Sequence, residues 1–294
     1  SYDGNVRIVL RAGQSCDKFN EDPHIKSVNF SADGIEDGCL LMQEQMLQMF
    51  RLHEQQVVFR IIRMNQPLID QPMAVIVNVL NRTCGIICEV VQGEGGVYPA
   101  DKEFLAGLRA LCDEKDILLI FDEVQCGMGR CGSLYAHDLY GVKPDVMTLA
   151  KALGCGVPVG AFVTAEKASH ALVPGDHGTT YGGNPFATAA VSAVYDIFEE
   201  EHITDHVKEV GAYLYEKLEE LKAEYSQITD HRGLGLMQGL EFSGPVGDII
   251  VRAMDKGLIL MSAGANVLRF VPPLVITKEH VDEMCGILRS VLTA

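Results

Sequence analysis

Long apolar runs and an excess of basic residues are both absent from this chain of 294 residues. No stretch of about 18 consecutive apolar residues occurs, so we expect no membrane-spanning helix. Lysine and arginine number 24 against 40 aspartate and glutamate residues, which gives a formal net charge of −16. A broad surface for nucleic acid or anionic membrane needs a basic stripe, so this balance argues against both kinds of partner. Small anionic ligands are not excluded, because the local field of a pocket can oppose the net charge.

Paired cysteine motifs are also missing. The nine cysteines form neither a zinc pattern nor an even disulfide framework, and the pair Cys84 and Cys88 stands alone. The histidines lack metal-ligand spacing among them, as is clear for His137, His170, His177 and His231. We therefore expect reduced thiols, no metal site and a cytoplasmic protein. The first residues show no basic region followed by an apolar core, so we expect no signal peptide.

What the chain does contain is a regular alternation of strand-like and helix-like segments from about residue 84 onward. A hydrophobic content of 48% is typical of a folded protein. Short apolar runs predict strands at 86–91, 117–121, 146–150 and 161–164. Helical spacing predicts helices at 104–112 and 185–200. This order predicts an α/β fold, with a mostly parallel sheet between helices.

The pattern changes after about residue 200. A charged amphipathic helix is predicted at 205–225, and a last helix at 278–292 with Thr277 as its N-cap. Strands are predicted near 236–242, 258–261 and 267–271. We expect a large domain over 76–200 and a smaller α+β domain over 201–294. Residues 1–75 stay unassigned, as a diverged or truncated part in which Met42, Met46 and Met49 suggest a helix and 57–62 a strand.

Three polar features follow the predicted strands. Asp122 ends a buried strand, at the edge where open parallel sheets bind ligands. Lys151 directly follows another apolar run, so we expect a buried lysine amine of the kind that imine chemistry uses. Thr179 and Thr180 lie in a glycine-rich segment whose hydroxyls and backbone donors suit a phosphate.

Taken singly, each feature has an ordinary explanation: a capping aspartate, a surface lysine and a turn. Taken together, a buried aspartate, a buried lysine and a phosphate cradle suggest pyridoxal phosphate. The lysine would bond to the aldehyde of the cofactor, and the aspartate would keep its pyridine nitrogen protonated.

The segments around these residues resemble the class III pyridoxal-phosphate-dependent aminotransferases, in particular those that act on N-acetylornithine. The resemblance covers about residues 75–294. It lies in EVVQGEGGVYPADKEFL, ILLIFDEVQCGMGRCG, GVKPDVMTLAKALG, GVPVGAF, HGTTYGGNP, RGLGLMQGLEF and NVLRFVPPLVIT. It implies fold type I of these enzymes, with a smaller C-terminal domain.

The resemblance also implies roles for single residues. Lys151 would attach the cofactor covalently and move a proton, and Asp122 would pair with the pyridine nitrogen. Gln125 would hydrogen-bond the phenolic oxygen of the ring, and Thr180 would bind the phosphate across a homodimer interface. Arg269 would hold a substrate carboxylate with two hydrogen bonds.

Two acidic residues complete this assignment. Glu94 would pair with Arg269 while the amine donor is bound and release it for 2-oxoglutarate. Glu89 would shape the pocket.

Several family features are replaced or missing. The glycine-rich phosphate loop of the type SGAEANE has no match, and neither has the aromatic-His-Gly segment that stacks on the cofactor. Cys126 and Cys131 stand where the family pattern has threonines, and cysteine is the weaker hydrogen-bond partner. Cys155 replaces a glycine after Lys151, which predicts crowding in a tight turn.

The implied activity is transfer of the terminal amine of N-acetylornithine to 2-oxoglutarate, as in arginine biosynthesis. One alternative is another terminal-amine donor: ornithine, succinylornithine or 4-aminobutyrate. Another alternative, from a different class, is a non-catalytic scaffold, because loss of the phosphate loop removes several backbone donors.

Overall fold

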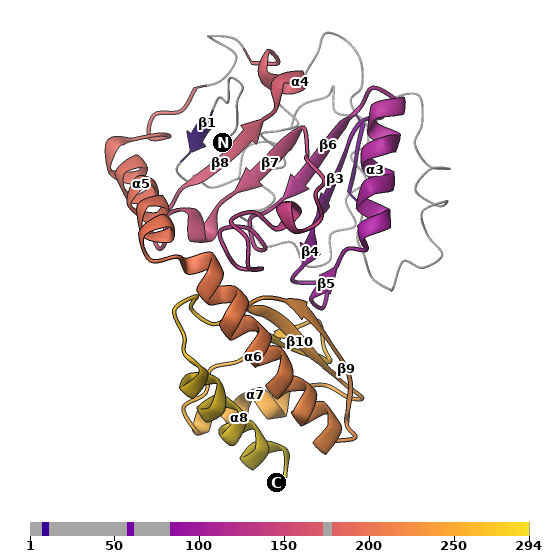
Figure 1. The fold of residues 1–294 in the computed structure, drawn as a ribbon, viewed down its shortest axis with the longest axis vertical. Coiled ribbons are helices and arrows are strands. Elements are labelled where there is room, and N and C mark those ends of the chain that lie inside the picture. The colour runs from indigo at the N-terminus through magenta and orange to yellow at the C-terminus, as the bar shows by residue number, and fades with distance from the viewer. Residues whose placement is uncertain (1–7, 12–57, 62–82, 173–177, 294) are drawn as a thin grey trace, which may run out of the picture.

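The computed structural model describes residues 8–11, 58–61, 83–172 and 178–293. Its larger sheet has six strands in the order β1-β8-β7-β6-β3-β2 (Figure 1). These strands are β1 (Ile8–Arg11), β2 (Val58–Ile61), β3 (Thr83–Glu89), β6 (Leu118–Asp122), β7 (Val146–Leu149) and β8 (Gly160–Thr164). The strands β2, β3, β6 and β7 run parallel to one another, and β8 is antiparallel to them. Because β1 is antiparallel to β8, it runs in the same direction as those four. The predicted α/β fold with a mostly parallel sheet is therefore confirmed.

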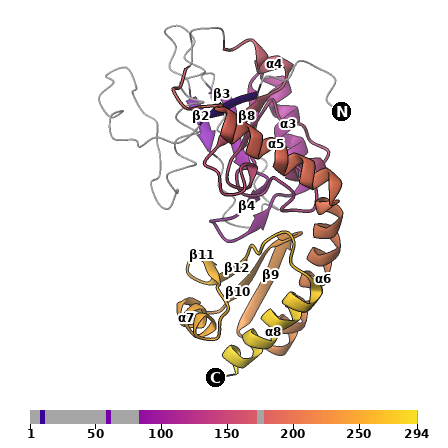
Figure 2. The same cartoon turned by 90° about the vertical axis from the view of Figure 1, so that its left-hand side faces the viewer.

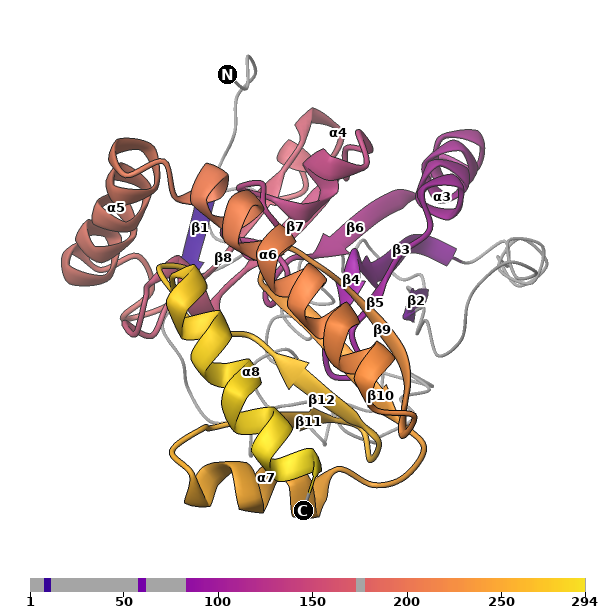
Figure 3. The same ribbon diagram turned by 60° about the horizontal axis from the view of Figure 1, so that its bottom comes forward.

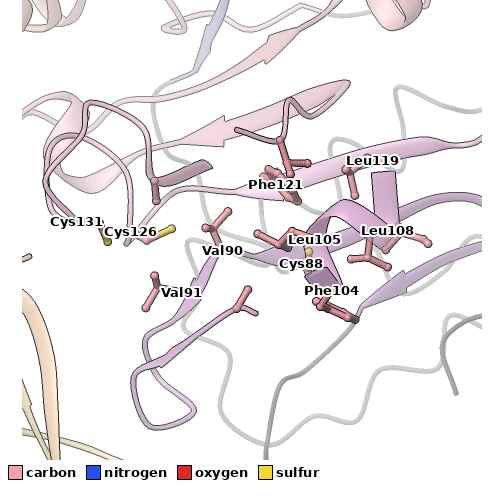
Figure 4. Packing of buried hydrophobic residues seen from close by; sticks show 14 of the residues in the cluster. Cys88, Val90, Val91, Phe104, Leu105, Leu108, Leu119, Phe121, Cys126 and Cys131 are labelled. Atoms are coloured by element: carbon pink, nitrogen blue, oxygen red, sulfur yellow. The ribbon is translucent and has the colours of Figure 1, made fainter. Parts of the chain in front are cut away.

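Helices flank this sheet because each buries one apolar stripe. In α3 (Lys102–Glu114) the buried face includes Leu105 and Leu108, and Asp101 caps the helix by accepting hydrogen bonds from two backbone amides. Figure 4 shows this face of α3 lying against β3 and β6. Further helical segments are α4 (Glu166–Ser169), α5 (Pro185–Glu200) and the 3₁₀ turns η2 (Ala136–Leu139) and η3 (Lys151–Leu153).

A second sheet of four antiparallel strands lies beyond α6, in the order β11-β12-β10-β9. Its strands are β9 (Ile228–Leu234), β10 (Met237–Phe242), β11 (Met261–Ala263) and β12 (Val267–Phe270). The helices α6 (Ile203–Glu224), α7 (Gly247–Asp255) and α8 (Lys278–Leu292) accompany it. Figure 3 shows α6 and α8 side by side across one face of this sheet. In Figure 2, α5 and α6 run along one side of the molecule, from the larger sheet to the smaller.

A short hairpin connects the two sheets. Its strands are β4 (Val91–Gln92) and β5 (Tyr98–Pro99), and they enclose the segment 93–97. Val97 is fully buried in the same apolar cluster as Met237 and Val267 of the four-stranded sheet. The hairpin therefore rests on the smaller sheet although β3, which precedes it, belongs to the larger one.

Most predicted elements are present, and a few differ. The helix predicted at 185–200 is α5, and Thr277 caps α8 in a capping box with His280. The strand predicted at 258–261 forms later, at Met261–Ala263. The strand β9 and the helix α7 were not predicted. The helix suggested by Met42, Met46 and Met49 lies outside the described residues, whereas the strand suggested at 57–62 is β2.

Candidate active site

The carboxyl ends of three parallel strands meet at one edge of the larger sheet. Glu89 is the last residue of β3 and lies opposite Asp122, the last residue of β6. Asp122 in turn lies opposite Thr148 of β7, and Lys151 follows that strand within two residues of its end. Sheet register therefore brings Asp122 and Lys151, both predicted site residues, to the same edge.

Asp122 is buried, with 6% of its surface exposed. Its Oδ1 atom accepts hydrogen bonds from the backbone N–H of Val124 at 3.0 Å and from the Thr148 hydroxyl at 3.1 Å. Two donors on one oxygen fix the orientation of the carboxylate. This confirms that Asp122 is a buried aspartate at a strand end.

Lys151 is not buried, contrary to the sequence-based expectation. Its residue is exposed, and it begins η3 with φ of 47°. The reason lies in the turn, because the left-handed backbone carries the chain out of the sheet edge directly after β7. A non-glycine residue in this region stores strain, which is common at functional sites. Cys155, four residues on, also has a positive φ, of 46°. This agrees with the tight turn expected at a position where the family has glycine.

Glu89 is the acidic residue whose importance the sequence understates. Burial, together with the charge of Asp122, raises the pKa of Glu89 to about 7, although a hydrogen bond from the Gly93 N–H and the charge of Lys151 work in the opposite direction. Glu89, Asp122 and Lys151 therefore share one electrostatic environment. A carboxyl group that titrates near neutral pH is suited to hold a proton there.

Arg269, Glu94 and Gln125 form a second cluster between the two sheets. Arg269 of β12 is 5% exposed and forms an ion pair with Glu94 through Nη1. The same Nη1 donates to Gln125 Oε1 at 3.2 Å, and Gln125 Nε2 donates to Glu94 Oε1 at 3.0 Å. Although partial burial works in the opposite direction, the hydrogen bond and charge of Arg269 hold the pKa of Glu94 below its ordinary value. The structure thus brings together three of the six predicted site residues by direct contact.

Two features show how this cluster is built and what it lacks. A Cβ on Gly93 would lie 1.7 Å from Gln125 Oε1, so the glycine allows the Gln125 amide to take this position. Arg269 Nε is buried and finds no hydrogen-bond partner among the described residues. Burying such a donor is costly, so it suits a site that receives an anionic group.

Thr180 stands apart from the other predicted residues. It is exposed, and within the described part of the chain no hydrogen bond or ion pair joins it to them. The neighbouring Thr179 hydroxyl accepts from the Gly182 N–H at 3.3 Å, and Asn184 caps α5 by accepting from the Ala187 N–H at 3.0 Å. The segment is therefore an exposed turn that its own side chains hold together.

The arrangement fits pyridoxal phosphate at the ring nitrogen and the aldehyde. A buried, oriented carboxylate suits a protonated ring nitrogen, and an exposed lysine amine at the same sheet edge suits the aldehyde. Thr180, which the sequence analysis expects at the phosphate, lies away from this edge in the described chain.

The cysteines of the Asp122 loop are structural. Cys126 and Cys131 are buried, and burial raises the pKa of both thiols well above the ordinary value, which makes them unreactive. Cys126 Sγ lies 3.6 Å from the backbone oxygen of Asp122, a weak hydrogen bond where a threonine hydroxyl would bond more closely.

Sequence reasoning missed three polar residues near the site, of which Glu123 and His137 are buried and Arg232 is partly buried. Glu123 and His137 form a buried pair with 2.7 Å between Oε1 and Nδ1, and Glu123 also accepts from the backbone amides of Ala136 and His137. Arg232 of β9 contacts the hairpin loop that carries Glu94. The available signals were the DE pair at the end of β6 and the arginine that opens RGLGLMQGLEF.

The structure addresses metals and membranes for the described residues only. There, no group of three or more His, Cys, Asp or Glu side chains has the arrangement of a metal site. No helix in the same residues combines the length and apolar character needed to cross a bilayer.

Known proteins similar to this chain are aminotransferases. The sequence model of the family described as Aminotransferase class-III matches residues 40–292. The acetylornithine aminotransferase of Methanocaldococcus jannaschii is 50% identical over 217 residues, which make up 73% of this chain and 54% of that protein. The succinylornithine transaminase of Yersinia enterocolitica is 46% identical over 70% of this chain and 50% of that protein.

Solved structures give the same picture. The N-acetylornithine aminotransferase from Stenotrophomonas maltophilia K279a matches with a TM-score of 0.78 and 29% identity, over 98% of this chain and 74% of that one. The chain spans about half the length of the curated relatives that it matches.

Proposed function

We propose, since this chain belongs to the class-III aminotransferase family, that it binds pyridoxal phosphate and transfers the terminal amine of N-acetylornithine to 2-oxoglutarate. The observation that carries the proposal is the Glu94–Gln125–Arg269 cluster beside the edge that holds Asp122 and Lys151. The similarity to acetylornithine aminotransferases supports N-acetylornithine as the amine donor. The proposed activity is that of the whole enzyme, of which this chain matches about half.

Lys151, Asp122 and Gln125 would hold the cofactor of their own subunit, and Thr180 would bind the cofactor phosphate across the homodimer interface. Bound pyridoxal phosphate supplies an electron sink that stabilises negative charge at the substrate carbon that bears the transferred amine. The Lys151 amine would take the proton from the carbon that bears the transferred amine and return it at C4′ of the cofactor. The Asp122 carboxylate, oriented by Val124 and Thr148, would keep the ring nitrogen protonated.

Arg269 would bind the α-carboxylate of 2-oxoglutarate. Its guanidinium is buried and planar, and carboxylates bind such a fork with two parallel hydrogen bonds. Glu94 neutralises Arg269 when no carboxylate is present, as the ion pair in this structure illustrates. Because Glu94 is partly exposed, its side chain can leave the pair with little desolvation cost.

The identity of the donor is the part of this proposal with close rivals. The similarity to a succinylornithine transaminase supports succinylornithine as the second candidate, and ornithine and 4-aminobutyrate complete the set. A non-catalytic scaffold is the alternative if the cofactor does not bind, since Thr180 alone represents the phosphate site here.

We also propose a homodimeric, cytoplasmic enzyme with the cofactor domain over 76–200 and the small domain over 201–294. Exposed Thr180 and its exposed neighbours Tyr181 and Phe186 support an interface there that carries Thr180 to the partner's site. The free cysteines among the described residues support a reducing compartment.

The test is a comparison of amine donors at equal concentration. Each of N-acetylornithine, N-succinylornithine, ornithine and 4-aminobutyrate is incubated with 2-oxoglutarate and pyridoxal phosphate, and glutamate formation is followed. We expect kcat/KM at least tenfold higher for N-acetylornithine than for ornithine. Equal or faster turnover of ornithine would contradict the proposed donor.

A further inference from the structure

The loop that carries Glu94 lies between two arginines of the four-stranded sheet. Arg232 of β9 and Arg269 of β12 both lie opposite Gly239 of β10, so the three residues form one row across the sheet. Arg269 contacts Glu94 at one end of the loop, as described above. Arg232 contacts the other end, at Gly96 and Tyr98.

The contacts of Arg232 are specific to a guanidinium. Its Nε donates to the backbone oxygen of Gly96 at 2.8 Å, and its Cζ lies 3.9 Å from the centroid of the Tyr98 ring. A Cβ on Gly96 would lie 3.2 Å from Arg232 Nη2 and 2.8 Å from the ring. The guanidinium and the ring therefore enclose this glycine from two sides.

The backbone of the loop needs to be held. Gly96 has φ of 120°, and Val97 has φ of 57°. A β-branched residue with positive φ is a genuine outlier, and such residues persist only where the surroundings fix them. Val97 is fully buried, and a Cβ on Gly239 would lie 3.1 Å from its Cβ, so the loop lies directly on the sheet.

The remaining contacts of Arg232 aim its side chain. Nη1 forms ion pairs with Asp230 at 2.7 Å and with Glu241 at 2.6 Å. Both carboxylates keep a third to a half of their side-chain surface in solvent, so these pairs add little stability of their own. They do orient the guanidinium so that Nε faces the carbonyl of Gly96.

We propose that Arg232 is a positioning residue that anchors the loop 93–97 to the four-stranded sheet, so that the Glu94 side chain leaves Arg269 while the loop backbone stays in place. This inference rests on the proposed function, in which Arg269 exchanges Glu94 for a substrate carboxylate. With the anchor in place, Glu94 is kept near Arg269 at a high effective concentration.

Loss of the anchor should strengthen dicarboxylate binding and weaken the donor half of the reaction. A loose loop holds Glu94 near Arg269 for less of the time, so a dicarboxylate competes more easily for the arginine. The donor half of the reaction, which needs the neutralised arginine, becomes less efficient. Simple damage to the fold would weaken both, so the opposite directions distinguish a positioning role from a structural one.

The experiment compares Arg232→Gln with Arg252→Gln. Arg252 lies in α7, and its Nε donates to the backbone oxygen of Asp248 within the same helix. Hydrogen exchange of peptides covering 93–99 and α8 is measured first, on the chain as purified. We expect exchange at 93–99 to rise about tenfold in Arg232→Gln and to stay unchanged in Arg252→Gln, with α8 unaffected in both. Unchanged exchange at 93–99, or an equal rise in α8, would overturn the anchor.

Binding and kinetics give the second readout. Glutarate, an unreactive dicarboxylate, is titrated by calorimetry, and kcat/KM for the donor is measured with pyridoxal phosphate present. We expect Arg232→Gln to bind glutarate severalfold more tightly and to lose about tenfold in donor kcat/KM. Weaker glutarate binding together with a lower donor kcat/KM would contradict the positioning role.

Further variants keep the test decisive if Arg232→Gln does not fold. Tyr98→Leu removes the ring and leaves the arginine. It should raise hydrogen exchange at 93–99 and tighten glutarate binding, as Arg232→Gln does, but by a smaller factor. Arg232→Lys keeps the charge without the planar fork and should restore little of the anchoring. If glutarate does not bind the parent chain at all, the proposed role of Arg269 fails, whereas the exchange measurement still decides the anchor.

Discussion

At the scale of single residues, Glu89 gives the site a proton that titrates near neutral pH. In the unfolded chain its pKa is near 4.5, and in the folded chain burial and the charge of Asp122 raise the pKa to about 7. Between these values the folded state binds more protons than the unfolded state. The free energy of unfolding therefore falls as the pH rises from about 4.5 through about 7.

We predict that Glu89→Gln removes this dependence. Between pH 4 and pH 8, the free energy of unfolding of the variant should rise by up to about 3 kcal/mol relative to that of the parent. The reason is that one pKa unit corresponds to about 1.4 kcal/mol. Urea unfolding of both proteins without cofactor, across this pH range, measures the difference. Glu103→Gln, on the exposed face of α3, is the matched control. Its free energy of unfolding should change with pH as that of the parent does. A free energy of unfolding that depends on pH equally in Glu89→Gln and in the parent would contradict a raised pKa of Glu89.

The residues of the candidate site were predictable from sequence to different degrees. Asp122 and Lys151 could be found because apolar strands end there, and parallel strand ends share one edge. The exposure of Lys151 could not be predicted, because it depends on a left-handed turn that the local sequence does not specify. The link from Glu94 to Arg269 spans 175 residues, so only the family resemblance suggested it.

At the scale of elements, β10 depends on a glycine where the hairpin loop meets the sheet. A Cβ at Gly239 would lie 3.0 Å from Val267 Cγ1 and 3.1 Å from Val97. Alanine normally stabilises a strand relative to glycine by about 0.5–1 kcal/mol. Here we predict that Gly239→Ala lowers the free energy of unfolding by about 1–2 kcal/mol, because buried neighbours on both sides have to move.

Gly286 of α8 provides the opposite case. Nothing lies within 4 Å of a Cβ built there. Gly286→Ala should raise the free energy of unfolding by about 0.5–1 kcal/mol, since alanine is the better helix former. Chemical denaturation of both variants tests the pair. A stabilising Gly239→Ala would show that the loop does not press on the sheet as described.

Element prediction succeeded where periodicity was strong and failed where it was weak. α5 and α8 carry clear apolar stripes and good N-terminal signals, such as Pro185 and Thr277. β9 contains Asp230, His231 and Arg232 in sequence, and a mostly polar strand lacks the alternation that would reveal it. α7 is only nine residues long and has no side-chain N-cap, which explains why it was missed.

At the scale of the whole molecule, the apolar side chains near Thr180 bear on the proposed dimer. Phe186 at the start of α5 is 74% exposed, and Tyr181 in the preceding turn is 64% exposed. We predict a dimer in sedimentation velocity, and a dissociation constant raised about tenfold or more in Phe186→Asp, because one buried aromatic anchor is lost. Val251→Asp, at an equally apolar exposed position in α7, is the control and should leave the dimer intact. A monomeric parent would contradict the interface.

Attachment of the cofactor at Lys151 is the central claim, and covalent trapping tests it most directly. The chain is incubated with pyridoxal phosphate, reduced with borohydride, digested and analysed by mass spectrometry, with Lys151→Ala and Lys143→Ala treated in parallel. We predict one predominant phosphopyridoxyl label, on Lys151, which is lost in Lys151→Ala and kept in Lys143→Ala. A folded parent chain that carries no label on Lys151, or labels its lysines indiscriminately, would contradict the account.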